Sequence, residues 1–120
     1  MVDSDQEHAA NVYAEQLTTQ LKKGVLSYLV LLICGRPVYT SEIIDRLHAA
    51  NLAVVEGTIY PLLARLQKDN LLHHSWQESP SGPPRKYYEI TEFGRLVQSE
   101  LTENIKTINQ ATKYLQKEIS

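Results

Sequence analysis

Apolar residues recur every four positions along the first third of the chain, which predicts a long amphipathic helix. The repeat consists of Tyr13, Leu17, Leu21, Val25, Leu29 and Ile33. Ser4 and Glu7 have the spacing of a capping box, so a helix can begin at Ser4. Gly24 lies within the repeat and leaves open whether this is one helix or two. Gly35 and Pro37 follow the repeat and predict its end.

Two shorter helices are predicted next. The first begins near Thr40 or Ser41, either of which can cap it, and ends at Asn51; its inward residues are Ile43, Ile44 and Leu47. The second spans about Gly57 to Asp69, has a standard helical spacing of apolar residues, and stops at Asn70; the apolar residues are Ile59, Leu62, Leu63 and Leu66. Two short helices with a tight connection indicate a helix-turn-helix.

From Leu71 onward the apolar pattern changes to a period of two, which predicts strands. One strand begins at Leu71, and the second covers residues 87–90, where Tyr87 and Tyr88 must point to opposite faces. The segment between them, residues 78–84, consists of turn-forming residues throughout. We therefore expect a β-hairpin, and a chain that is mainly α-helical with one small β-hairpin.

The last predicted helix begins after Thr91, which can cap it, and carries a heptad pattern of apolar residues. These residues are Leu101, Ile105, Ile108, Thr112, Leu115 and Ile119. A helix of about 27 residues is about 40 Å long, so its apolar stripe extends past a small domain and needs a partner. A second copy of the chain is the simplest partner. The pattern divides the chain into an acidic N-terminal extension (1–16), a winged helix-turn-helix (17–91) and a C-terminal dimerisation helix (92–120).

Composition limits the possible functions. The chain has 120 residues, enough for one domain, and a net charge of −2. Residues 1–16 contain four acidic and no basic residues, whereas residues 17–90 contain eight basic and six acidic residues. The mild positive charge of the middle segment permits nucleic-acid binding without requiring it. The single cysteine, Cys34, lies in an apolar run, which favours an inert buried thiol in a reducing, cytoplasmic setting.

Two longer motifs resemble those of a known family. Residues 56–72, EGTIYPLLARLQKDNLL, resemble the recognition-helix signature of the PadR family of transcriptional regulators. Residues 84–94, PRKYYEITEFG, are similar to the wing strand and the start of the last helix in that family. The likeness covers roughly residues 17–94, and the chain length fits the branch with a single C-terminal helix. It implies a dimeric DNA-binding protein, usually a repressor, whose C-terminal helix packs against its partner.

The pattern and the resemblance together select candidate DNA contacts. On a helical wheel, a polar stripe faces away from the apolar side of the third helix; it consists of Thr58, Pro61, Arg65 and Lys68. An ordinary solvated helix face is the alternative. Further candidates are Tyr60 on the flank of that helix, Thr40 and Ser41 at the start of the second, and Arg85 and Lys86 beside the wing. Each also has a plainer structural explanation as a packing residue, a cap or a surface charge.

The same reasoning selects a dimer interface and, within it, a place for a small-molecule effector. The candidate interface residues are Tyr13, Leu17, Leu21, Val97, Leu101, Ile105, Ile108 and Leu115. Some members of the resembled branch grip flat hydrophobic drugs with a Trp on the C-terminal helix, and Ile105 stands at that position here. The only Trp of this chain is Trp76, in the predicted hairpin.

Metal binding and catalysis find little support in the sequence. His73 and His74 are adjacent and would point to opposite faces of a strand, so we expect no metal site. No glycine-rich phosphate loop, carboxylate pair or activated nucleophile is recognisable, so we expect neither an enzyme nor a cofactor, and no membrane segment. The first hypothesis is a homodimeric regulator that binds a pseudo-palindromic DNA operator. The alternative is a winged-helix module that binds another protein instead of DNA.

Overall fold

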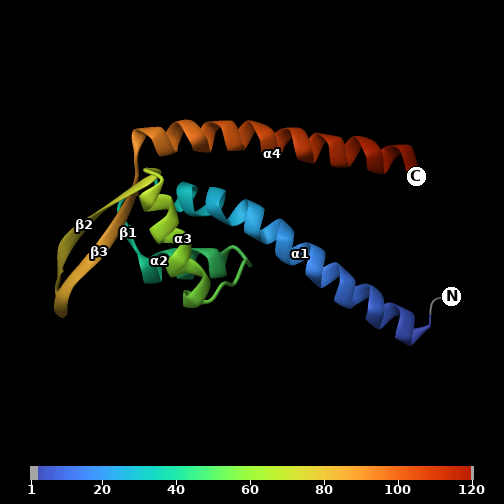
Figure 1. Ribbon diagram of the computed structural model, residues 1–120, viewed down its shortest axis with the longest axis horizontal. Coiled ribbons are helices and arrows are strands. Elements are labelled where there is room, and N and C mark those ends of the chain that lie inside the picture. Colours follow the sequence, from blue (N-terminus) through green and yellow to red (C-terminus); the bar gives the residue numbers. More distant parts are fainter. Residues whose placement is uncertain (1–2, 120) are drawn as a thin grey trace.

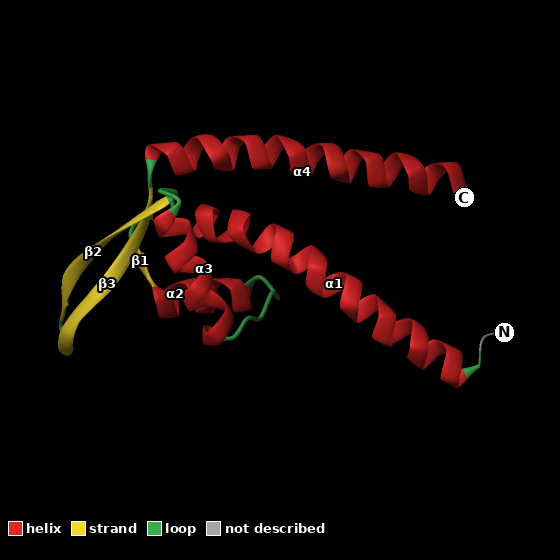
Figure 2. Cartoon of the chain, in the orientation of Figure 1, coloured by secondary structure: helices red, strands yellow, loops and turns green. Residues whose placement is uncertain are grey.

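The computed structural model describes residues 3–119, so Met1, Val2 and Ser120, which the predicted terminal segments include, lie outside the described residues. The elements follow the order α1, β1, α2, α3, β2, β3, α4 (Figure 1). Helices α2 and α3 lie beside the inner end of α1, and the hairpin of β2 and β3 extends from the other side (Figure 2). This is a winged helix-turn-helix with one long helix before it and one after it.

Helix α1 is a single helix, Ser4–Ile33, of 30 residues. Its N-cap is Asp3, whose Oδ1 accepts a hydrogen bond from the backbone N–H of Gln6 at 2.7 Å. The prediction that Ser4 caps this helix was therefore wrong by one residue: Ser4 is already helical, and the carboxylate before it satisfies the free amide. Gly24 lies inside the helix without interrupting it.

The helix-turn-helix consists of α2 (Thr40–Ala49) and α3 (Glu56–Lys68). Both predicted helix ends are confirmed: Asn51 and Asn70 follow the last helical turns and have left-handed φ angles of 63° and 64°, which cannot continue a helix. The cap expected at Thr40 or Ser41 was wrong. Thr40 is the first helical residue, and the Tyr39 backbone N–H before it donates to Glu42 Oε1 at 3.4 Å.

The sheet has three antiparallel strands in the order β1-β3-β2 rather than only a hairpin. Strand β1 (Val38–Tyr39) pairs with β3 (Gly82–Ile90), which also pairs with β2 (Leu72–Ser79). Two residues are too few to show a period, so no sequence pattern indicated β1. The predicted turn over 78–84 was too long, because Ser79 pairs with Gly82 and the strands continue almost to the tip.

The core lies where the inner end of α1, helices α2 and α3, and the base of the sheet meet. Its buried residues are Leu26, Val30, Leu31, Cys34, Val38, Ile43, Leu47, Ile59, Leu62, Leu63, Leu66, Leu72, Tyr88 and Ile90. All the apolar residues predicted for the inward side of α3 belong to it. Burial raises the pKa of the Cys34 thiol to about 12, because the charged thiolate would lose its hydration. The expected buried thiol is confirmed.

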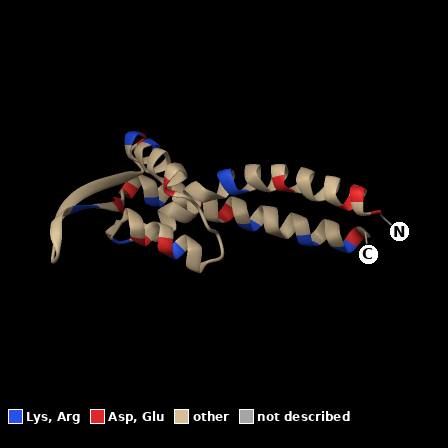
Figure 3. Cartoon of the chain, turned by 90° about the horizontal axis from the view of Figure 1, so that it is seen from below, with Lys and Arg blue, Asp and Glu red and all other residues tan. Residues whose placement is uncertain are grey.

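Helix α4 (Glu92–Ile119) begins at the end of β3, with Thr91 as its cap. The Oγ1 of Thr91 accepts from the Gly94 N–H at 2.8 Å and donates to the Asn70 carbonyl at 2.7 Å, as the sequence predicted for a cap. Tyr28 Oη and Thr102 Oγ1, 2.9 Å apart, join α1 to α4. Beyond this contact the two helices extend away from the domain (Figures 1 and 3), and their outer ends diverge (Figure 1).

Candidate nucleic-acid interface

A groove separates the wing from the two short helices. Its volume is about 460 Å³, and its lining residues are Tyr39, Thr40, Ser41, Tyr60, Trp76, Arg85, Lys86 and Tyr88. Five of the nine residues predicted to contact DNA therefore come together here, although they belong to α2, α3 and β3. They form one surface because β3 passes beside β1, which leads directly into α2.

Aromatic rings support both cations of this groove. The Arg85 guanidinium carbon lies 4.6 Å from the ring centre of Tyr39, and Lys86 Nζ lies 5.3 Å from the ring centre of Tyr88. Such contacts orient a cation without neutralising its charge. Within residues 3–119, neither Arg85 nor Lys86 has an acidic partner at ion-pair distance. The groove therefore presents two positive charges that a phosphate group can approach.

The wing is tied to the recognition helix. The His74 Nδ1 of β2 lies 3.0 Å from Gln67 Oε1 of α3, within hydrogen-bond distance. Tyr39 and Tyr87 meet edge to face, with ring centres 5.4 Å apart, which fixes β1 against β3. Tyr88 is buried and Tyr87 half-buried, so the two tyrosines do face different surroundings, as predicted. These contacts hold Arg85 and Lys86 at a set position relative to α3.

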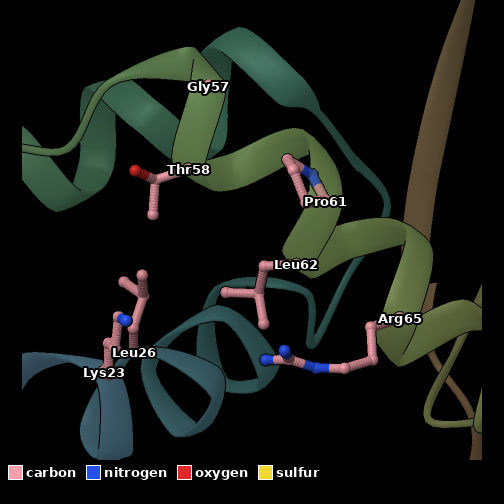
Figure 4. A pocket seen from close by; sticks show the side chains of 7 residues that line it. All are labelled: Lys23, Leu26, Gly57, Thr58, Pro61, Leu62 and Arg65. Carbon is pink, nitrogen blue, oxygen red and sulfur yellow. The ribbon is translucent and has the colours of Figure 1, made fainter.

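Helix α3 carries the predicted polar stripe, and three of its four residues line a second pocket. Thr58, Pro61 and Arg65 face a space of about 350 Å³ that α3 shares with α1. Figure 4 shows Arg65 extending from α3 toward α1, where Lys23 and Leu26 project into the same pocket. The fourth residue, Lys68, is exposed in the last turn of α3 and lines neither space.

Four aromatic or charged lining residues were not among the predicted contacts: Tyr39, Trp76, Tyr88 and Lys23. Tyr39 belongs to the short strand β1, which has no recognisable period. Trp76 was placed in the hairpin, and its pairing with Lys86 could have suggested that it lies on the groove side. Lys23 is distant from α3 in sequence, so only the packing of α1 against α3 brings it beside Arg65.

His73 and His74 point to opposite faces of β2, as is usual for adjacent residues of a strand. His73 lies 3.6 Å from Glu89 across the hairpin, whereas His74 contacts Gln67, so the adjacent histidines have different partners. Residues 3–119 contain no cluster of three potential metal ligands. No helix in the described part of the chain is long and apolar enough to span a membrane.

The fold and the groove define a winged-helix protein of the DNA-binding type. The family model described as the transcriptional regulator PadR-like family matches residues 29–113, and the chain belongs to this family. Its members regulate transcription and are not enzymes. The resemblance seen in the two sequence motifs is thereby confirmed.

Solved structures agree with this assignment. A PadR-like transcription factor from Bacteroides fragilis is 44% identical, with a TM-score of 0.70, over 83% of this chain and 98% of that chain. A PadR-like transcriptional regulator from Bacillus cereus is 36% identical, with a TM-score of 0.74, over 80% and 95% of the two chains. A PadR family regulator from Eggerthella lenta is 28% identical, with a TM-score of 0.80, over 90% and 96%. A search of curated proteins finds no match.

Proposed function

We propose that this DNA-binding regulator is a homodimer that recognises a pseudo-palindromic operator and represses transcription until a small molecule releases it. The observation that carries the proposal is the groove between wing and helices, in which five predicted DNA contacts meet, two of them the unneutralised cations Arg85 and Lys86. In this proposal α3 enters the major groove with Thr58 and Pro61 near base edges, while Arg65 and Lys68 lie nearer phosphates. Arg85 and Lys86 contact the neighbouring minor groove or its phosphates.

Three groove residues outside the wing, Thr40, Ser41 and Tyr60, are proposed to contact phosphates. Thr40 and Ser41 occupy the first positions of α2, where backbone N–H groups and hydroxyls suit a phosphate oxygen. Tyr60 is 51% exposed and lines the groove, which supports phosphate contact over packing beneath the wing. Together these residues fix the position of α3 on the duplex.

Dimerisation is proposed from the two projecting helices. Of the eight predicted interface residues, five are exposed and lie on the projecting parts of α1 and α4; their exposed fractions are Tyr13 65%, Leu17 49%, Leu21 68%, Ile108 62% and Leu115 55%. Val97, Leu101 and Ile105 are half-buried closer to the domain. Exposed apolar side chains in such number favour a protein partner.

Charge supports a second copy as that partner. The outer half of α1 is acidic, with Asp5, Glu7 and Glu15. The outer half of α4 is mildly basic (Figure 3): Lys106, Lys113 and Lys117 outnumber Glu118, and Lys106 also pairs with Glu103 at 3.7 Å within the helix. A two-fold axis places the same two helices of each copy against the other, so an acidic segment and a basic segment are available on both sides of the contact. We assign residues 92–120 to dimerisation, 17–91 to DNA binding and the extension 1–16 to this interface.

The cleft between α1 and α4 supplies a place for an effector. It measures about 590 Å³, and its lining is mainly apolar: Leu17, Gln20, Leu21, Gly24, Val25, Tyr28, Leu101, Asn104, Ile105 and Ile108. A hydrophobic molecule held there would change the tilt of α4 and, through the dimer, the spacing of the two recognition helices. Ile105 provides aliphatic contact rather than aromatic stacking. Because the proposed ligand is DNA, we place the protein in the cytoplasm.

The proposal is tested with two double variants, each of which loses two positive charges. Arg85→Ala combined with Lys86→Ala removes two cations from the groove, and Lys22→Ala combined with Arg36→Ala removes two exposed cations that line neither the groove nor the cleft between α1 and α4. The affinity for duplex DNA is measured by fluorescence anisotropy at several salt concentrations. We expect the groove variant to lower the slope of log K against log salt by about 0.9 for each lost phosphate contact, and the Lys22/Arg36 variant to keep the wild-type slope. Equal slopes in the two variants would favour the alternative, a protein-interaction module.

A further inference from the structure

The pocket between α1 and α3 combines two cations with a hydroxyl. Lys23 of α1 and Arg65 of α3 both line it, together with Thr58. No acidic residue is among its lining residues, and within residues 3–119 neither cation forms an ion pair. Leu26 and Leu62, each 6% exposed, form its apolar base. An apolar wall strengthens the attraction between these cations and an anion that reaches the pocket.

The pocket lies on the opposite flank of α3 from the wing groove. Successive residues of an α-helix are about 100° apart, so Tyr60, which lines the wing groove, lies roughly 200° from Thr58, which lines the pocket. Exposed Lys68, which lines neither space, lies between these flanks on the outer side of the helix. Helix α3 is therefore bordered by positive charge on both sides, by Arg85 and Lys86 on one and by Lys23 and Arg65 on the other.

This arrangement fits the two phosphate strands that border a major groove about 12 Å wide. We propose that Lys23 and Arg65 bind a backbone phosphate on the strand opposite the one contacted by the wing residues Arg85 and Lys86. The guanidinium supplies paired N–H donors and the ammonium a point charge. Lys23 thus joins the DNA-contact set although it lies outside the helix-turn-helix. The inference rests on the proposed DNA binding by α3.

The test uses Lys23→Gln with Lys22→Gln as its control. Lys22 is the neighbouring exposed lysine on α1, and it does not line the pocket, so both variants lose one charge from the same helix turn. The DNA is the operator obtained by selection from a random duplex pool, at several salt concentrations. We expect Lys23→Gln to lower the salt slope by about 0.9 and Lys22→Gln to leave it unchanged. Lys23→Arg, which keeps the charge, should retain the wild-type slope.

A second experiment identifies the operator phosphate that Lys23 contacts. Single operator phosphates are replaced by neutral methylphosphonates, and the loss of affinity is compared between the wild type and Lys23→Gln, as in a double-mutant cycle. We expect one replacement that weakens the wild type but not Lys23→Gln, on the strand opposite the replacement that couples to Lys86→Ala. Identical behaviour of the Lys23 and Lys22 variants, or coupling of Lys23 and Lys86 to the same strand, would overturn the inference. A wild type that selects no operator would instead overturn the proposed function itself.

Discussion

Gly94 in the first turn of α4 allows the closest approach between that helix and the domain. A Cβ at this position would lie 2.3 Å from the Leu71 carbonyl oxygen and 2.7 Å from Cγ1 of Ile90. The Leu71 oxygen also accepts the Thr91 N–H at 3.0 Å, so moving α4 away to make room would lengthen that hydrogen bond. Adding a methyl group to a packed site lowers the free energy of unfolding by about 1–3 kcal/mol, and a contact this short belongs at the upper end of that range.

The higher helix propensity of alanine offsets about 1 kcal/mol of this cost, so Gly94→Ala should lower the free energy of unfolding by about 2 kcal/mol. With a urea m-value of about 2 kcal/mol/M, the unfolding midpoint should fall by about 1 M. The control is Gly57→Ala in α3, where an added Cβ would have no atom within 4 Å. Urea unfolding is followed by far-UV circular dichroism at one fixed protein concentration. A Gly94→Ala variant as stable as Gly57→Ala would refute the reasoning.

Three further predictions follow from single residues. Thr91→Ala removes the cap of α4 and should lower the free energy of unfolding by about 0.5–2 kcal/mol in the same urea assay. Thr107→Ala, on the exposed side of α4, should lower the free energy of unfolding by less. Burial raises the pKa of the Cys34 thiol to about 12, so it should react with a disulfide reagent at pH 8 only after unfolding; fast reaction of the folded protein would contradict its burial. Trp76, 64% exposed in the wing groove, should change its fluorescence when operator DNA binds, and an unchanged spectrum would place the wing away from the duplex.

The raised pKa of the Cys34 thiol also affects the pH dependence of stability. The unfolded chain ionises this thiol near pH 8.5, its ordinary value, while the folded chain keeps it protonated. The contribution of the neutral thiol to stability is thus complete below about pH 8.5 and decreases as the pH rises toward 12. A Cys34→Ala variant should lack this alkaline decrease.

The helices and the wing were predictable because their signals are local. The four-residue repeat predicted α1, the spacing of Ile59, Leu62, Leu63 and Leu66 predicted α3, and Thr91 marked the start of α4. The cap of α1 was misplaced by one residue and that of α2 by one or two, because the exact end of a helix depends on backbone geometry that residue type alone does not determine.

The candidate site was predictable residue by residue, but its arrangement was not. The sequence identified Arg85 and Lys86 by their charge near a turn, yet it did not show that Tyr39 and Tyr88 support them. It placed Thr58 and Arg65 on one exposed stripe, whereas the packing of α1 against α3 makes them part of a pocket with Lys23. Contacts between elements that are distant in sequence depend on tertiary packing, which a helical wheel does not contain.

The central claim is that two copies of the chain together recognise an inverted DNA repeat. The most direct test is sequence selection: the purified full chain is mixed with a random duplex pool at moderate salt, and the bound sequences are read after several rounds. The account predicts an enriched inverted repeat whose half-sites are separated by about one helical turn, roughly 10 base pairs. Enrichment of a single half-site without symmetry would contradict the dimer, and no enrichment at any salt concentration would contradict DNA recognition.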